Sequence, residues 1–132
     1  MSLCLVSGSL LAALPLTAFT LAWTHSIEKT RWEEDWQVRD GKLALVAARI
    51  RGSGAGMEIP PDAALRDGIW HYVPTLPPQD SLRVLHSPYV TAYELCETGR
   101  CRPFTDLLPG IAENAGPDAI IENRPCPGRK TP

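Results

Sequence analysis

The chain has 132 residues, of which 44% are hydrophobic and 21% are charged, and its formal net charge is −2. These values are typical of a folded globular protein, and the length suits one domain with a single core. The weakly acidic balance and the scattered lysines and arginines argue against a nucleic-acid-binding protein, which needs a basic stripe. Thirteen prolines, concentrated after residue 60, favour short strands and irregular loops over long helices.

The first part of the chain is apolar, but its pattern favours strands. No Asp, Glu, Lys or Arg occurs in the first 27 residues, and the stretch from Leu3 to Trp23 could span a bilayer. Gly8 and Pro15, however, divide it into pieces of strand length, and the last piece alternates as a half-buried strand does. We therefore expect strands rather than a signal or anchor, at Leu3–Val6, Leu10–Leu14 and Ala18–Ser26. Because the basic start of a secretory signal is missing, the sequence favours a cytoplasmic location, with export to the periplasm as the alternative.

A β-hairpin is predicted in the middle of the chain. Two alternating runs flank the dipeptide Asp40-Gly41, which is a strong signal for a two-residue turn. The predicted strands are Thr30–Val38 and Leu43–Ile50.

The register of this hairpin follows from its turn. Trp36 should lie opposite Leu45, and Glu34 should lie opposite Ala47. Arg49 would then be a diagonal neighbour of Glu34 on the same face. A carboxylate among tryptophans is expensive to bury unless a partner such as this arginine satisfies it.

Further strands are expected after a glycine-rich loop at Gly52–Met57. They are Ile69–Val73, Leu82–His86, and a last hairpin formed by Tyr89–Cys96 and Cys101–Phe104. After Pro109 the apolar periodicity is lost. The predicted architecture is all-β, a small antiparallel β-sandwich or partly open barrel. Residues 1–108 would form a single β domain, and residues 109–132 an irregular proline-rich tail of little fixed structure.

The chain has four cysteines, and one pair is placed to form a disulfide. If Thr98-Gly99 form a two-residue turn, Cys96 faces Cys101 across a hairpin at a separation that suits a cross-strand bridge. A cytosolic location would keep both thiols reduced, so the oxidation state stays open. A zinc site is disfavoured, because no second ligand pair is evident.

The candidate binding residues gather around the tryptophan-rich stretch and the glycine-rich loop. His25 lies at the end of a strand face, but Ser26 points the opposite way and cannot be activated by it. Glu33 and Asp35 are expected on a solvated strand face. The glycine-rich loop could offer N–H groups to an anion, although it lacks the ending of a P-loop. The candidate binding residues are His25, Ser26, Trp32, Glu34, Trp36, Arg49, Gly52, Gly54 and Gly56.

Four motifs together resemble one small prokaryotic family. They are W-T-H-S-I-E-K-T-R-W-E-E-D-W, R-I-R-G-S-G-A-G-M-E, I-W-H-Y-V-P and S-P-Y-V-T-A-Y-E-L-C. The chain is similar, over Leu3 to Leu107, to the domain of unknown function 1850. The resemblance implies a gene beside a TRAP-type solute transporter of the TAXI subclass, and hence an accessory component of that transporter. It implies no catalytic residues.

Two classes of function fit these observations. The first is a non-enzymatic β-domain that binds a transporter permease or its solute-binding protein and meets the membrane only through that partner. The second is a binding module for an organic acid or an ion, with a pocket formed by Trp23, Trp32, His25 and Arg49. An enzyme is not expected, since no nucleophile–base pair, metal box or cofactor fingerprint is evident, and no cofactor or metal is predicted.

Overall fold

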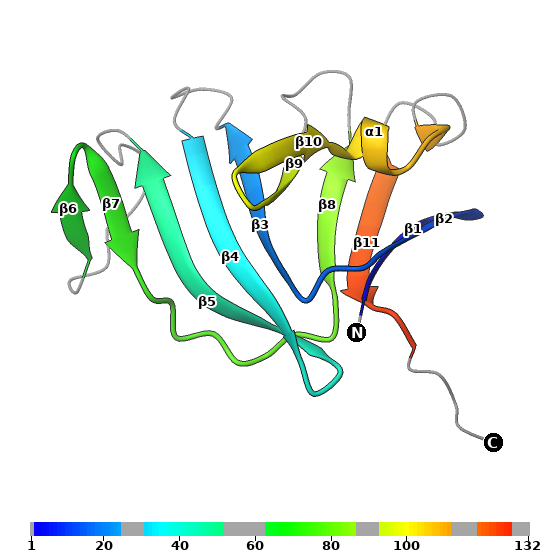
Figure 1. Cartoon of the computed structure of the whole chain (residues 1–132), viewed down its shortest axis with the longest axis horizontal. Coiled ribbons are helices and arrows are strands. Elements are labelled where there is room, and N and C mark those ends of the chain that lie inside the picture. The colour runs from blue at the N-terminus through cyan, green and yellow to red at the C-terminus, as the bar shows by residue number, and fades with distance from the viewer. Residues whose placement is uncertain (1, 25–30, 52–62, 87–92, 112–118, 128–132) are drawn as a thin grey trace.

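The fold is a pair of antiparallel β-sheets. The computed structural model describes residues 2–24, 31–51, 63–86, 93–111 and 119–127. A four-stranded sheet has the order β2-β1-β11-β8, and a seven-stranded sheet has the order β10-β9-β3-β4-β5-β7-β6 (Figure 1). This arrangement confirms the predicted all-β class and agrees with a sandwich.

The element bounds follow the alternation of the sequence closely in the first half of the chain. The early strands are β1 (Leu3–Ser7), β2 (Leu10–Leu14), β3 (Ala18–Thr24), β4 (Arg31–Arg39) and β5 (Lys42–Arg51). The later elements are β6 (Ala64–Arg66), β7 (Ile69–Tyr72), β8 (Leu82–His86), β9 (Glu94–Glu97), β10 (Arg100–Pro103), α1 (Phe104–Leu107) and β11 (Ala119–Pro125).

The apolar segment at the N-terminus forms strands, as predicted. Leu3 and Leu5 of β1 are fully buried and point towards the core between the two sheets. Phe19 and Leu21 of β3 enter the same core from the larger sheet. In the described parts of the chain, no helix is long and apolar enough to cross a membrane.

Part of the predicted irregular tail is instead a central strand. β11 pairs with β1 on one side and with β8 on the other. The prediction of little fixed structure is therefore wrong for this segment. Its inward positions are Ile121 and Asn123, both buried, and the polar Asn123 breaks the apolar alternation by which a strand is recognised. The Asn123 amide nitrogen donates to the carbonyl oxygens of Leu82 and Ile121, at 3.3 Å each, which satisfies its donor groups within the sheet.

Three hairpins of the larger sheet turn through the same backbone shape. Asp40-Gly41, Asp67-Gly68 and Thr98-Gly99 all have positive φ at both residues. This is the geometry of a type I′ turn, whose twist matches the strands that flank it. The predicted hairpins at Asp40-Gly41 and Thr98-Gly99 are confirmed.

All four cysteines form disulfides. The Cys96–Cys101 bridge, whose oxidation state the sequence left open, joins β9 to β10. The second bridge, between Cys4 and Cys126, was not predicted, and it ties β1 to the end of β11 across a sequence separation of 122. The N–H of Cys126 also donates to the carbonyl oxygen of Ser2 at 2.9 Å.

Candidate functional site

A β-bulge in β5 decides which side chains meet on each face of the larger sheet. Near the turn the register is as predicted, with Trp36 opposite Leu45. Beyond it, Asp35 pairs with Ala47, so that Val46 has no residue opposite it. An extra residue turns every later side chain to the other face. Arg49 therefore pairs with Glu33.

The prediction that Arg49 shares a face with Glu34 is wrong. Glu34 pairs with Ala48 rather than with Ala47, and Arg49 lies on the opposite side of the sheet from Glu34 and Trp32. Arg49 therefore does not share a face with Trp23 and Trp32, the tryptophans of the predicted pocket. We call the side of the sheet that contains Glu33 the polar face, and the side that contains Glu34 the aromatic face.

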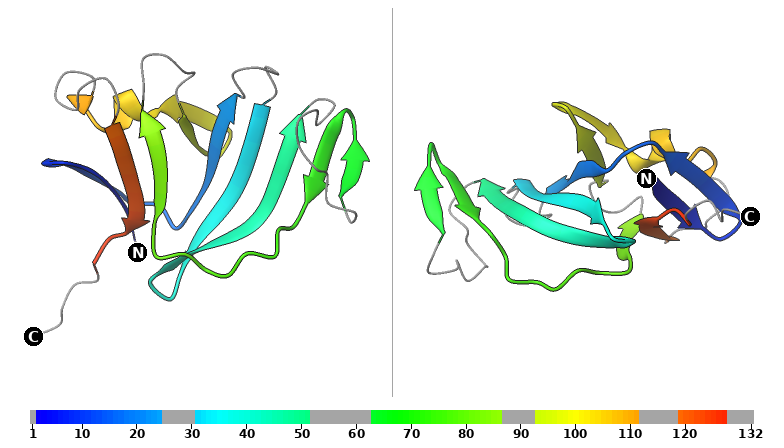
Figure 2. Two further views of the ribbon diagram at one scale, coloured as in Figure 1. Left: turned by 180° about the vertical axis from the view of Figure 1, so that it is seen from behind. Right: turned by 60° about the horizontal axis from the view of Figure 1, so that its bottom comes forward.

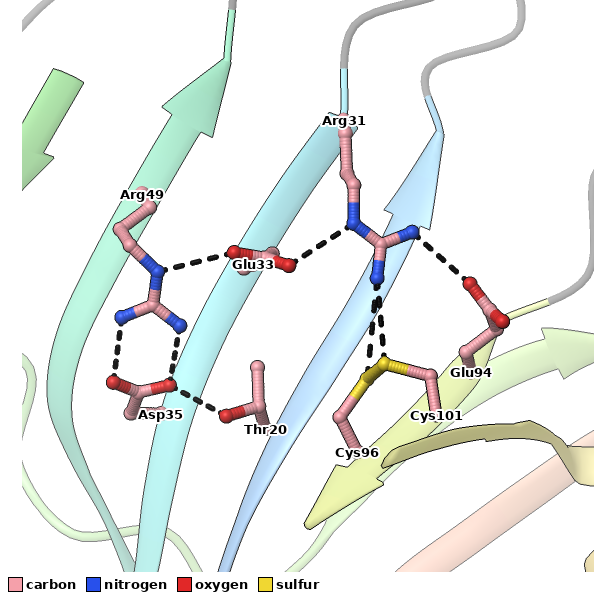
Figure 3. Close-up of polar contacts among 8 residues, drawn as sticks. All are labelled: Thr20, Arg31, Glu33, Asp35, Arg49, Glu94, Cys96 and Cys101. Atoms are coloured by element: carbon pink, nitrogen blue, oxygen red, sulfur yellow. Dashed lines mark hydrogen bonds and ion pairs between the residues drawn. A yellow bond between two sulfur atoms is a disulfide. The ribbon is translucent and has the colours of Figure 1, made fainter. Parts of the chain in front are cut away.

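A network of ion pairs crosses the polar face (Figure 3). The Arg49 guanidinium donates to both carboxylate oxygens of Asp35, at 2.6 and 2.7 Å, and its Nε donates to Glu33 at 3.1 Å. Arg31 donates to the other Glu33 oxygen at 3.0 Å and to Glu94 at 3.0 Å. These side chains are only 24–32% exposed. The network therefore links β5, β4 and β9 through largely buried charges.

The network holds its carboxylates in the ionised state. Hydrogen bonds from Arg49 are the largest cause that lowers the pKa of Asp35, and the Thr20 hydroxyl adds a bond of 2.6 Å. Burial would raise the pKa of Glu33, but hydrogen bonds from Arg31 and Arg49 outweigh it and lower the pKa. In turn, the Asp35 carboxylate raises the pKa of Arg49. Each charge thus stabilises its neighbour.

A groove of about 630 Å³ lies above this network. Its floor includes Asp35 and Arg49, and its wall includes Glu97, Thr98 and Cys101 of the β9–β10 hairpin. The hairpin stands off the face of the larger sheet (Figure 2, right). The Cys96–Cys101 disulfide crosslinks its two strands. The groove therefore has a charged floor and a covalently fixed wall.

Arg31 connects this disulfide to the ion-pair network. Its Nη2 lies 3.6 Å from the Cys101 sulfur and 3.9 Å from the Cys96 sulfur, while Nε and Nη1 bind carboxylates (Figure 3). The Arg31 guanidinium thus contacts both the disulfide of the β9–β10 hairpin and a carboxylate in the floor of the groove.

The aromatic face has a different chemistry. Trp23 stacks on Trp32 across β3 and β4 at a centroid distance of 5.9 Å, and it also contacts Tyr93 at 5.4 Å. Glu34 lies between Trp32 and Trp36 on this face. Burial raises the pKa of Glu34, and a 3.3 Å hydrogen bond from the Trp36 indole only partly offsets this effect.

The structure brings together three of the predicted site residues. Trp32, Glu34 and Trp36 share the aromatic face, but Trp36 is 3% exposed and belongs to the core, where no partner can reach it. Arg49 lies on the other face. Five candidates fall outside the described residues: His25, Ser26, Gly52, Gly54 and Gly56.

The ion-pair network on the polar face is the feature that the sequence prediction missed. Glu33 and Asp35 were expected on a solvated strand face, yet they are the centre of the ion-pair network. The available signal was the clustering of charge in R-W-E-E-D-W opposite A-A-R-I-R. Across the described parts of the chain, no three or more His, Cys, Asp or Glu side chains are grouped so that they could hold a metal ion.

The family model of the domain of unknown function (DUF1850) matches residues 19–104. The chain belongs to the DUF1850 family. The match begins in β3 and ends in α1, so it includes both faces of the larger sheet. The matched region therefore contains every residue of the ion-pair network and of the aromatic face. No curated protein and no solved structure is significantly similar to the chain.

Proposed function

We propose that this DUF1850 domain is a non-enzymatic accessory protein of a TAXI-type TRAP solute transporter, and that it docks on the permease or the solute-binding protein. The docking surface would be the groove between the β9–β10 hairpin and the ion-pair network. The observation that supports this proposal best is the construction of that groove, which has a fixed wall and a floor of mutually paired charges.

Pre-organisation is what makes such a groove suitable for a protein partner. Association is opposed by the entropy of ordering side chains at the interface. Arg49 is already fixed by two hydrogen bonds to Asp35, and Arg31 by bonds to two carboxylates. A partner therefore would not have to order these long side chains. Polar side chains at the wall of the groove, such as Glu97 and Thr98, would discriminate between protein partners.

The electrostatics of the groove argue against general acid–base catalysis. A catalytic acid or base works best when its pKa lies near the operating pH. The pKa values of Glu33 and Asp35 are lowered, and both carboxylates are bound to guanidinium groups. They would remain ionised and paired at neutral pH, which supports a binding role.

The groove is also poorly suited to an organic acid. Two arginines and three carboxylates form the network, so the floor carries an excess of negative charge. An incoming carboxylate would have to displace Asp35 from the fork of Arg49. The register of β5 also places Arg49 on the opposite side of the sheet from Trp32, which does not support the alternative of a pocket formed by Arg49 and tryptophans.

The two disulfides bear on the compartment in which the domain would act. Disulfides persist in oxidising compartments and are rare in the cytosol. Pairing of all four cysteines therefore supports the exported alternative over the cytoplasmic location that the sequence favours. We propose that the domain meets its partner on the outer side of the cytoplasmic membrane.

Co-purification tests this proposal. Tagged protein would be used to capture the permease and the solute-binding protein, each expressed with it, from detergent-solubilised membranes and from the soluble fraction. We expect one of them to be enriched, and we expect Glu97→Arg on the wall of the groove to reduce the enrichment at least about tenfold.

The matched control is Asp80→Arg, which makes the same change of charge outside the groove at a side chain that is 86% exposed. It should leave the enrichment unchanged. Failure to capture either protein, or an equal loss in both variants, would contradict the proposal.

A further inference from the structure

Glu34 is a half-buried carboxylate that lacks a counter-ion within the described parts of the chain. Its neighbours across the strands are Leu21 and Ala48, and neither can pair with a charge. Among the described residues, the side chain that donates a hydrogen bond to it is the Trp36 indole, at 3.3 Å. The guanidinium groups of β4 and β5 that could have paired with it lie on the polar face. Burying an unpaired carboxylate is costly, so a cationic partner would stabilise it.

Aromatic rings surround this carboxylate. Trp32 and Trp36 flank it along β4, since residues two apart on a strand share a face. Trp23 and Tyr93 extend the layer beyond Trp32, with centroid distances of 5.9 and 5.4 Å between successive rings. Four aromatic side chains from β3, β4 and the residue before β9 therefore lie on the side of the sheet that Glu34 faces.

A further ring lies on the opposite side of Glu34. Tyr72 of β7 is in the same cross-strand row, separated from Glu34 by the small Ala48. Burial raises the pKa of both the Tyr72 and the Tyr93 phenol, and the negative charge of Glu34 adds to each increase. The field of this carboxylate thus reaches aromatic groups on both sides of it.

This combination of groups selects one class of ligand. The faces of aromatic rings attract cations, most strongly when the cation is desolvated, and a carboxylate supplies the counter-charge. A divalent metal ion would find one carboxylate and no further set of oxygen ligands. An anion would be repelled. We propose that the aromatic face binds an organic ammonium group, with Glu34 as its counter-ion and Trp23, Trp32 and Tyr93 contributing ring faces. This inference goes beyond the docking groove and does not depend on it.

The ammonium group could belong to a free methylated amine or to a lysine side chain of a polypeptide. Intrinsic tryptophan fluorescence reports on either, because two of the rings are tryptophans. Tetramethylammonium chloride and N-acetyl-lysinamide would be titrated separately against sodium chloride of equal ionic strength. The neutral isostere 3,3-dimethyl-1-butanol would serve as the uncharged probe.

We expect a saturable change with at least one of the two ammonium probes and none with the alcohol or sodium chloride. The probe that binds more tightly identifies the source of the group. Glu34→Gln should weaken binding about tenfold or more, since it removes the counter-charge and keeps the shape. Glu122→Gln, on the other sheet, is the matched control and should bind as the unaltered protein does.

Circular dichroism would show that both variants are folded. The inference is overturned if neither ammonium probe gives a saturable change. It is equally overturned if Glu34→Gln binds as tightly as Glu122→Gln, because the carboxylate would then contribute nothing.

Discussion

Removal of the Cys4–Cys126 disulfide should destabilise the domain much more than removal of Cys96–Cys101. The first bridge closes a sequence separation of 122, and the second closes a separation of 5. The chain-entropy relation for loop closure gives about 5 kcal/mol at 25 °C for the long loop and about 2 kcal/mol for the short one. Both values are upper estimates, because an unfolded chain retains some structure, but their order should hold.

The measurement is urea unfolding of two double variants, Cys4→Ala/Cys126→Ala and Cys96→Ala/Cys101→Ala, without reductant. Each keeps one disulfide, so each is the control for the other. The first should lose about 3 kcal/mol more of its free energy of unfolding than the second, and its m-value should rise because its unfolded state is more expanded. Since small domains have only about 5–15 kcal/mol of stability, it could unfold without urea, which would agree with the same reasoning. An equal or greater loss in the second variant would refute it.

Three further predictions concern the larger sheet, each tested by urea unfolding. Arg49→Met should lower the free energy of unfolding by about 1–3 kcal/mol, because it leaves the Asp35 carboxylate without its ion-pair partner. Lys42→Met, at an exposed ion pair, should lower it by less than about 1 kcal/mol. Equal losses in the two variants would contradict this difference in burial. Deletion of Val46 should lower the free energy of unfolding by less than Arg49→Met does, because the bulge would become a regular ladder in which Arg49 still lies opposite Glu33; a loss as large as that of Arg49→Met would contradict this register. Glu34→Gln should stabilise the domain at neutral pH. The gain should disappear below about pH 4, where the carboxyl is protonated in both the folded and the unfolded state; a gain that persists at acidic pH would exclude this cause.

The alternation of the sequence predicted most of the strands because one face of each is buried. The N-terminal strands and the β4–β5 hairpin are examples, and the Asp40-Gly41 turn fixed their local register. The same signal occurs at Asp67-Gly68, which joins β6 to β7, but the short and exposed β6 has no alternation to support it. Local sequence patterns therefore predicted a hairpin where the turn was flanked by strands with one buried face.

Features that depend on distant residues could not be predicted in this way. The bulge at Val46 moves the inward positions from Leu43 and Leu45 to Ala48 and Ile50, but it can be located only against β4, and it decides which face Arg49 occupies. β11 is a strand because β1 and β8 flank it on both sides. The bridge between Cys4 and Cys126 forms because β11 returns beside β1. Each of these contacts becomes visible only when the pairing of remote strands is known.

The central claim is that three consecutive acidic residues have opposite environments, because the sheet separates the polar face from the aromatic face. A pH titration of their side-chain carboxyl carbons by NMR tests this directly. The pKa of Glu34 should lie above the ordinary value for a glutamate, and the pKa values of Glu33 and Asp35 should lie below their ordinary values. If Glu34 titrated at or below its ordinary value, or if all three shifted in the same direction, the assignment of the two faces would be contradicted.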